Sequence, residues 1–131
     1  MGENPMPEVL NEPKNLGEVL LYEEENVYYS RDEIIIAQDE VISIGQVLAR
    51  DDDSGEYIAL NLADGEAAGS DVAAAIAIRN IDATDEPVET VVLVRHCIVK
   101  RDGLVWPEEM TPEELVTAIE QLQALGILIR R

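Results

Sequence analysis

Three groups of residues in this sequence have side chains that could take part in chemistry: an acidic turn, a histidine beside a cysteine, and two lysines. In the first group, Asp51, Asp53 and Gly55 match part of a D-x-D-x-G calcium-binding loop. A complete EF-hand loop also needs a bidentate carboxylate at its last position and a helix on either side. The flanking residues are instead typical of strands, so we interpret 51–55 as an acidic hairpin turn and predict no metal site.

His96 and Cys97 are the only histidine and the only cysteine of the chain. They are adjacent within a strand-like run, and successive side chains of a strand point to opposite faces. They therefore cannot serve one substrate as base and nucleophile. Such a site would also need an acid that orients the base and donors for an oxyanion, and the sequence marks neither. We predict no catalytic residue.

The sequence also gives little support for nucleotide binding or for a covalently attached carrier group. The chain has no G-x-G-x-x-G and no G-K-[ST] string, which argues against a phosphate-binding loop. The segment 42–50, ISIGQVLAR, is similar to strands of lipoyl and biotinyl carrier domains, but Lys14 and Lys100 do not occupy the hairpin tip that those domains modify. We predict no cofactor. A lipoyl- or biotinyl-carrier-like β domain and a small trimeric all-β enzyme, such as a nucleotide hydrolase, are the alternative interpretations.

The charge of the chain limits its partners. The 28 acidic and 9 basic residues give a formal net charge of −19. Such a chain repels phosphate backbones and anionic lipid headgroups, so we predict no nucleic-acid partner and no membrane partner. It has no signal-peptide pattern and no apolar run of membrane-spanning length. We expect a protein made in the cytosol.

The elements that would position these residues are mostly strands. At 131 residues the chain has the length of one domain with its own core. Runs rich in β-branched and aromatic residues predict strands at 34–36, on both sides of 51–55, at 72–81, at 88–100 and at 127–131. The run 88–100 is the most strongly β-branched, and we predict that it crosses the core as one strand.

One helix is predicted over about 112–125. Thr111 and Glu114 have the spacing of a capping box, and Pro112 fits the first helical position because it lacks an amide hydrogen. Gly126 follows as a C-terminal cap. A parallel α/β scaffold would need several such helices, so we predict a β-rich domain with one late helix.

The joint between the last long strand and the helix carries Trp106, the only tryptophan of a chain without phenylalanine. Pro107 follows it. A large aromatic ring is often buried in a core, but tryptophan is also frequent among the residues that dominate interfaces. We predict that Trp106 and Pro107 belong either to the core or to a subunit interface.

Several segments, taken in their order along the chain, resemble the lambda-type head decoration protein family of tailed bacteriophages and prophages. They are YSRDEIII, GQVLARDDDSGEYIALN, AAAIAIRNIDAT, VVLVRHCIVKRDGLVWP and AIEQLQALGILIRR, and they cover roughly Tyr22 to Arg131. The string LVWPE is the most recognisable of these features. The resemblance implies a mainly β fold, a small β-barrel or β-tulip-like domain at 27–131 with one C-terminal helix, preceded by an extended arm at 1–26 that is disordered until it binds.

The resemblance also implies a function without catalysis. Proteins of this family form homotrimers on the outer face of the expanded capsid, at three-fold positions, and stabilise the shell. The implied partner is the major capsid protein, with no small-molecule substrate, and the implied location is the virion after synthesis in the host cytoplasm. On this reading the capsid-binding arm contributes Leu21, Tyr22, Val27, Tyr28 and Tyr29, and the joint at Trp106 is core or trimer interface.

Overall fold

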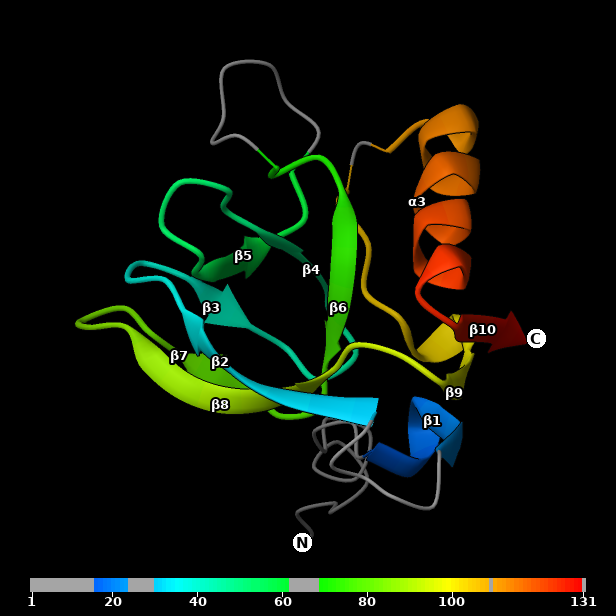
Figure 1. Cartoon of the computed structure of the whole chain (residues 1–131), viewed down its shortest axis with the longest axis horizontal. Coiled ribbons are helices and arrows are strands. Elements are labelled where there is room, and N and C mark those ends of the chain that lie inside the picture. Colours follow the sequence, from blue (N-terminus) through cyan, green and yellow to red (C-terminus); the bar gives the residue numbers. More distant parts are fainter. Residues whose placement is uncertain (1–15, 24–29, 62–68, 109, 131) are drawn as a thin grey trace, which may run out of the picture.

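The computed structural model describes residues 16–23, 30–61, 69–108 and 110–130 of the chain. Its elements are η1 (Leu16–Glu18), β1 (Leu20–Glu23), β2 (Arg31–Ile36), β3 (Val41–Ile42), β4 (Val47–Arg50), β5 (Tyr57–Ala59), β6 (Ala73–Ala77), β7 (Ile81–Asp82), β8 (Val88–Leu93), β9 (Cys97–Lys100), η2 (Arg101–Gly103), α3 (Pro112–Ala124) and β10 (Ile127–Arg130). Figure 1 shows the strands beside a single long helix near the C-terminal end. The mainly β fold class is therefore confirmed.

Five strands form a closed barrel in the order β2-β5-β4-β6-β8. β2 and β8 are antiparallel along their whole length, and β2 is parallel to β5 through the pair Ile36 and Tyr57. Side chains that alternate along these strands fill the interior. The buried interior residues are Ile36, Ile42, Leu48, Ala75, Ala77, Ala83, Val92 and Val94.

A second layer covers part of the outer barrel surface. It consists of α3 and a three-stranded sheet, here called the small sheet, in the order β1-β9-β10 (Figure 1). β1 is antiparallel to β9, and β10 is parallel to β9. Leu122 of α3 and Ile127 of β10 are fully buried in a second core between the layers. The domain thus has one core inside the barrel and one outside it.

The predicted hairpin at 51–55 is confirmed, because β4 and β5 are antiparallel on its two sides. Asp51 organises the turn: its Oδ1 accepts a hydrogen bond from the backbone N–H of Asp53 at 2.9 Å, and its carbonyl accepts one from the N–H of Gly55 at 2.8 Å. Gly55 has a φ of +79°, which a glycine adopts without strain. The Asp51 carboxylate therefore acts as the local cap of an acidic turn.

The predicted helix is confirmed with its caps. Thr111 Oγ1 accepts a hydrogen bond from the Glu114 N–H at 3.1 Å, and Glu114 Oε1 accepts one from the Thr111 N–H at 2.8 Å. Pro112 occupies the first turn, and Gly126, with a φ of +88°, follows the helix. Among the described residues, no helix is long and apolar enough to cross a membrane.

The prediction of one strand over 88–100 is wrong. β8 ends at Leu93 in the barrel, and β9 begins at Cys97 in the small sheet. The ladder stops because the backbone N–H groups of Val94 and Arg95 turn to the Ser30 carbonyl, at 2.9 and 3.4 Å. His96 then takes a left-handed φ of 53°. The β-branched run contains no glycine or proline, so nothing in its composition signals the change of sheet.

Thr90 is a polar residue buried in the barrel wall. It is 6 % exposed, and its hydroxyl has no hydrogen-bond partner in the described part of the chain. Replacing Thr90 with valine keeps the shape and removes a desolvated hydroxyl, so we expect stability to rise by about 1 kcal/mol. Thermal unfolding measures this. The control is Thr84→Val, which removes an exposed hydroxyl that donates to Asp82 at 2.5 Å. A similar loss of stability in both variants would contradict the prediction.

Candidate functional site

The structure describes two of the five predicted arm residues. Leu21 and Tyr22 lie on β1, and their side chains are 48 % and 54 % exposed. Val27, Tyr28 and Tyr29 lie outside the described residues. An exposed leucine and an exposed tyrosine on an outer strand of a sheet each provide contact area for another protein.

β1 and η1 lie against the domain, although the predicted arm at 1–26 includes them. Val19, between them, is fully buried, and its carbonyl accepts a hydrogen bond from the backbone N–H of Lys100 at 2.7 Å. β1 then pairs with β9. The described part of the predicted arm is therefore an anchored root. That the arm is ordered only when it binds stays a prediction.

A close approach of three backbone segments fixes this root. A Cβ atom at Gly103 would lie 2.2 Å from the Glu18 carbonyl oxygen and 2.9 Å from Val19 Cα. A Cβ at Gly45 would lie 2.2 Å from the Gly103 carbonyl oxygen. Gly45 also has a φ of +89°. Only glycine fits at either position, so we call the contact of Gly45, Gly103 and Glu18 the glycine junction. The sequence did not predict the glycine junction, because a glycine in a sequence does not indicate which distant backbone segment it approaches.

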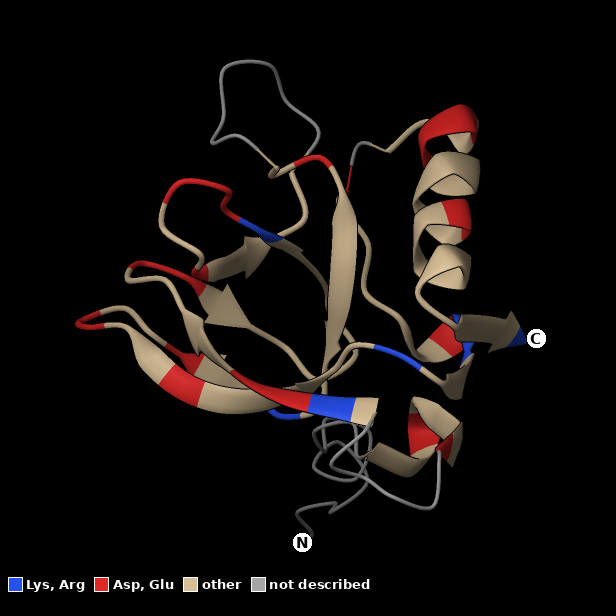
Figure 2. Ribbon diagram, in the orientation of Figure 1, with Lys and Arg blue, Asp and Glu red and all other residues tan. Residues whose placement is uncertain are grey.

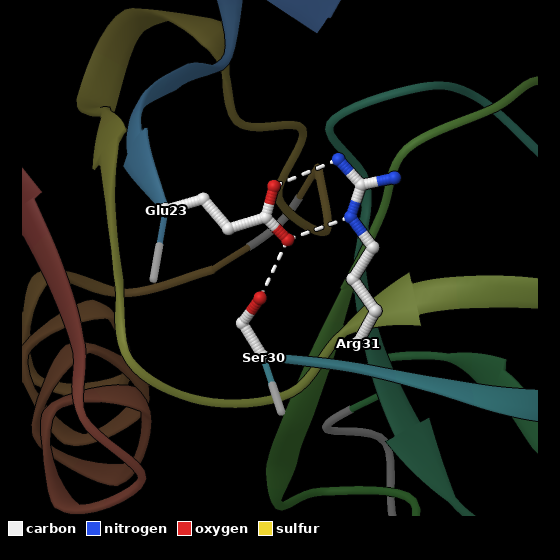
Figure 3. Close-up of polar contacts among 3 residues, drawn as sticks. All are labelled: Glu23, Ser30 and Arg31. Atoms are coloured by element: carbon white, nitrogen blue, oxygen red, sulfur yellow. Dashed lines mark hydrogen bonds and ion pairs between the residues drawn. The ribbon is translucent and has the colours of Figure 1, made fainter. Parts of the chain in front are cut away.

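An ion pair holds the other end of β1 to the barrel (Figure 3). The Glu23 carboxylate accepts hydrogen bonds from Arg31 Nε at 2.6 Å and from Arg31 Nη2 at 2.8 Å. Ser30, which is fully buried, donates its hydroxyl to Glu23 Oε2 at 2.5 Å. Because Glu23 belongs to the small sheet and Arg31 to the barrel, this bidentate pair joins the two layers.

The same contacts set the pKa of Glu23. Burial raises the pKa of Glu23, but the hydrogen bonds from Arg31 and Ser30 and the positive charge of Arg31 outweigh burial, so the net pKa is below the ordinary 4.5. A carboxyl group whose pKa is lowered in the folded state stabilises that state above its unfolded pKa. The stabilisation is lost as the pH falls through the lower, folded-state pKa.

Glu23→Gln is therefore expected to lower the free energy of unfolding by about 1–2 kcal/mol at neutral pH, because hydrogen bonds to a charged group are lost. The difference between the variant and the unaltered protein should shrink as the pH falls below 4.5. Urea unfolding at a series of pH values measures it. Glu89→Gln, at an exposed carboxylate of β8, is the control. An effect of Glu23→Gln that did not depend on pH would contradict this account.

The outer face of the small sheet carries a row of three apolar side chains. Tyr22 of β1 lies opposite Ile98 of β9, and Leu128 of β10 lies on the other side of Ile98. The neighbours Cys97 and Ile127 are buried and face the core, so the row faces outward. The three side chains border a hollow of about 220 Å³. The sequence indicated Tyr22 as a candidate contact residue but not Ile98 or Leu128. A sequence alone does not show which residues of neighbouring strands lie opposite one another.

Trp106 packs at the border of the core between the layers. Its side chain is half-buried against that core, and Pro107 beside it is also half-buried. The preceding residue, Val105, forms a parallel bridge with Gln46, and its N–H donates to the Gly45 carbonyl at 2.9 Å. The ring therefore contributes to packing. A role of Trp106 and Pro107 in a trimer interface stays a prediction.

His96 and Cys97 do not share a strand as predicted, since His96 lies in the turn before β9. His96 is exposed, whereas Cys97 is 2 % exposed. Burial, with the negative charge of Glu23, raises the pKa of Cys97 to about 12, against the smaller lowering effect of Arg31. The thiol is therefore protonated at neutral pH and is a poor nucleophile. Within the described residues, no group of three or more His, Cys, Asp and Glu side chains could hold a metal ion.

The described residues form a small closed barrel with an exposed sheet face and an anchored N-terminal root. The family model for bacteriophage lambda head decoration protein D matches residues 9–127, so the chain belongs to this family. No curated protein matches the chain. The match confirms the resemblance found in the sequence. Because the family consists of structural, generally non-catalytic proteins of the virion capsid, the chain has a role in capsid decoration.

Proposed function

We propose that the protein forms trimers on the outer surface of the expanded capsid, at three-fold positions, and that it stabilises the shell by binding the major capsid protein. The family match over residues 9–127 carries this proposal. The match includes the anchored root, which would lead to the shell-binding arm, and the barrel, which would cover the shell surface.

The root suits an arm that binds by adding a strand. β1 is an outer strand of the small sheet, and an extended segment at the start of the chain could bind by pairing with an exposed strand edge of the shell. One such arm would bind weakly, because ordering an extended segment costs conformational entropy. Three arms on a trimer act together, and the effective concentration of the second and third raises the overall affinity.

The charge of −19 opposes assembly of the trimer in free solution. Copies of so acidic a chain repel one another, so salt that screens the repulsion should favour the trimer. On the capsid, an acidic coat keeps virions apart. On this proposal the protein is made in the host cytoplasm and is added to the outer face of the capsid after the shell has expanded.

The test is to mix the purified protein with expanded empty capsids and to measure bound protein by sedimentation and occupancy by electron microscopy. Decoration of three-fold positions is expected on expanded capsids, and unexpanded capsids are the control. A chain that lacks residues 1–15 keeps every described strand and helix, and it is expected to lose most of its attachment. If the protein does not sediment with expanded capsids, the proposed function is wrong.

A further inference from the structure

The apolar row Tyr22, Ile98 and Leu128 has an unusual border for so acidic a chain. Lys100 of β9 and Arg130 of β10 follow Ile98 and Leu128 on the same outer face, two residues further along each strand. Arg101 comes next in the chain. Figure 2 shows basic residues on β9 and β10 of the small sheet, and it shows acidic residues on the barrel turns, on α3 and also next to the small sheet, at η1, β1 and η2. We call Tyr22, Ile98, Leu128, Lys100 and Arg130 the basic-rimmed face.

The two cations lie directly opposite each other in the sheet, since Arg130 is the register partner of Lys100. Like charges at opposite positions destabilise a sheet. Neither ion pair of the described residues involves them: one joins Arg31 to Glu23 and the other joins Arg95 to Asp32. An anionic group from outside the domain would remove the repulsion. An apolar centre of partly exposed side chains with a charged rim is also the usual composition of an interface.

We infer that the basic-rimmed face is a second contact with the capsid shell, beside the arm, and that it binds an apolar surface of the shell protein bordered by carboxylates. The inference rests on the proposed function. β1 supplies Tyr22 to this face and is also part of the root of the arm, so the face and the root lie side by side. The cations allow an approach that the remaining acidic surface would oppose.

The test uses charge reversal with a matched control. Lys100→Glu with Arg130→Glu and Arg50→Glu with Arg79→Glu change the net charge equally, and Arg50 and Arg79 are exposed on or beside other strands. Binding to expanded capsids is measured by sedimentation for both double variants. We expect the Kd to rise about tenfold or more for the first pair and at most about threefold for the second. Added salt should improve binding of the first variant relative to that of the unaltered protein, because it screens the repulsion that the new acidic residues create.

A second pair, Lys100→Gln with Arg130→Gln, removes the charges without adding acids and guards against a folding defect, which thermal unfolding would detect. It is expected to weaken binding by an intermediate factor. If the unaltered protein binds capsids and the Lys100 and Arg130 variants bind like the control, this inference is wrong and the proposed function stands. If they bind capsids normally but lose self-association in sedimentation equilibrium, the face serves a second copy and the shell contact is overturned. If the unaltered protein does not bind, both proposals fail.

Discussion

A chain that lacks residues 1–26 is expected to unfold at a temperature roughly 10 °C or more below that of a chain that lacks only residues 1–15. The longer deletion removes Val19, which is fully buried and whose burial stabilises by about 1.5–3 kcal/mol. It also removes the Glu23 partner of Arg31 and exposes one edge of β9. The sum is on the order of 3–5 kcal/mol. Differential scanning calorimetry of the two truncated chains measures it.

The pair of truncations also separates stability from attachment. A loss of capsid binding after the longer deletion could reflect a damaged domain, whereas the shorter deletion tests the arm alone. Equal unfolding temperatures for the two chains would mean that β1 does not stabilise the domain. The description of this segment as an anchored root would then be wrong.

Gly103→Ala is expected to lower the free energy of unfolding by about 2–4 kcal/mol. The added Cβ would meet the Glu18 carbonyl oxygen at 2.2 Å, and backbone atoms cannot move aside as the end of a flexible side chain can. Gly55→Ala is the control. An alanine at the φ of +79° of this position lowers stability by about 1 kcal/mol, but its Cβ would meet only the flexible Arg50 side chain. Urea unfolding compares the two variants.

A double-mutant cycle assigns the effect of Gly103→Ala to the glycine junction. In the chain without residues 1–26 the opposing backbone of Glu18 and Val19 is gone, so Gly103→Ala should then cost well under half of what it costs in the full chain. An equal cost in both backgrounds would place the strain elsewhere and would contradict the junction.

The features that the sequence predicted correctly are the ones encoded by neighbouring residues. The capping box of Thr111 and Glu114, the turn at Asp51 and the late strand at 127–130 each depend on a few consecutive positions. The mainly β class follows from composition and from the number of short strand-like runs. The family also followed from the order of several segments.

The features that escaped prediction depend on residues far apart in the chain. The pairing of β1 with β9 joins Leu20 to Val99, and the glycine junction joins Glu18 to Gly103. No local pattern encodes such partners. The break near His96 escaped for a different reason, because backbone hydrogen bonds to Ser30 end β8 within a run whose composition favours one strand. The basic-rimmed face likewise needs the register of three strands before its members can be seen together.

β1 has a mechanical consequence for the proposed attachment of the N-terminal arm to a shell. Tension on the arm reaches a strand that is fastened at its start by the glycine junction and at its end by Glu23 and Arg31. The first attachment reaches Gly103, which follows β9 of the small sheet, and through it Gly45, which hydrogen-bonds to Ala77 of the barrel; the second attachment reaches β2 of the barrel directly. A pull on one arm is therefore divided between the two layers, and it cannot peel the strand from β9 without also breaking a contact to the barrel.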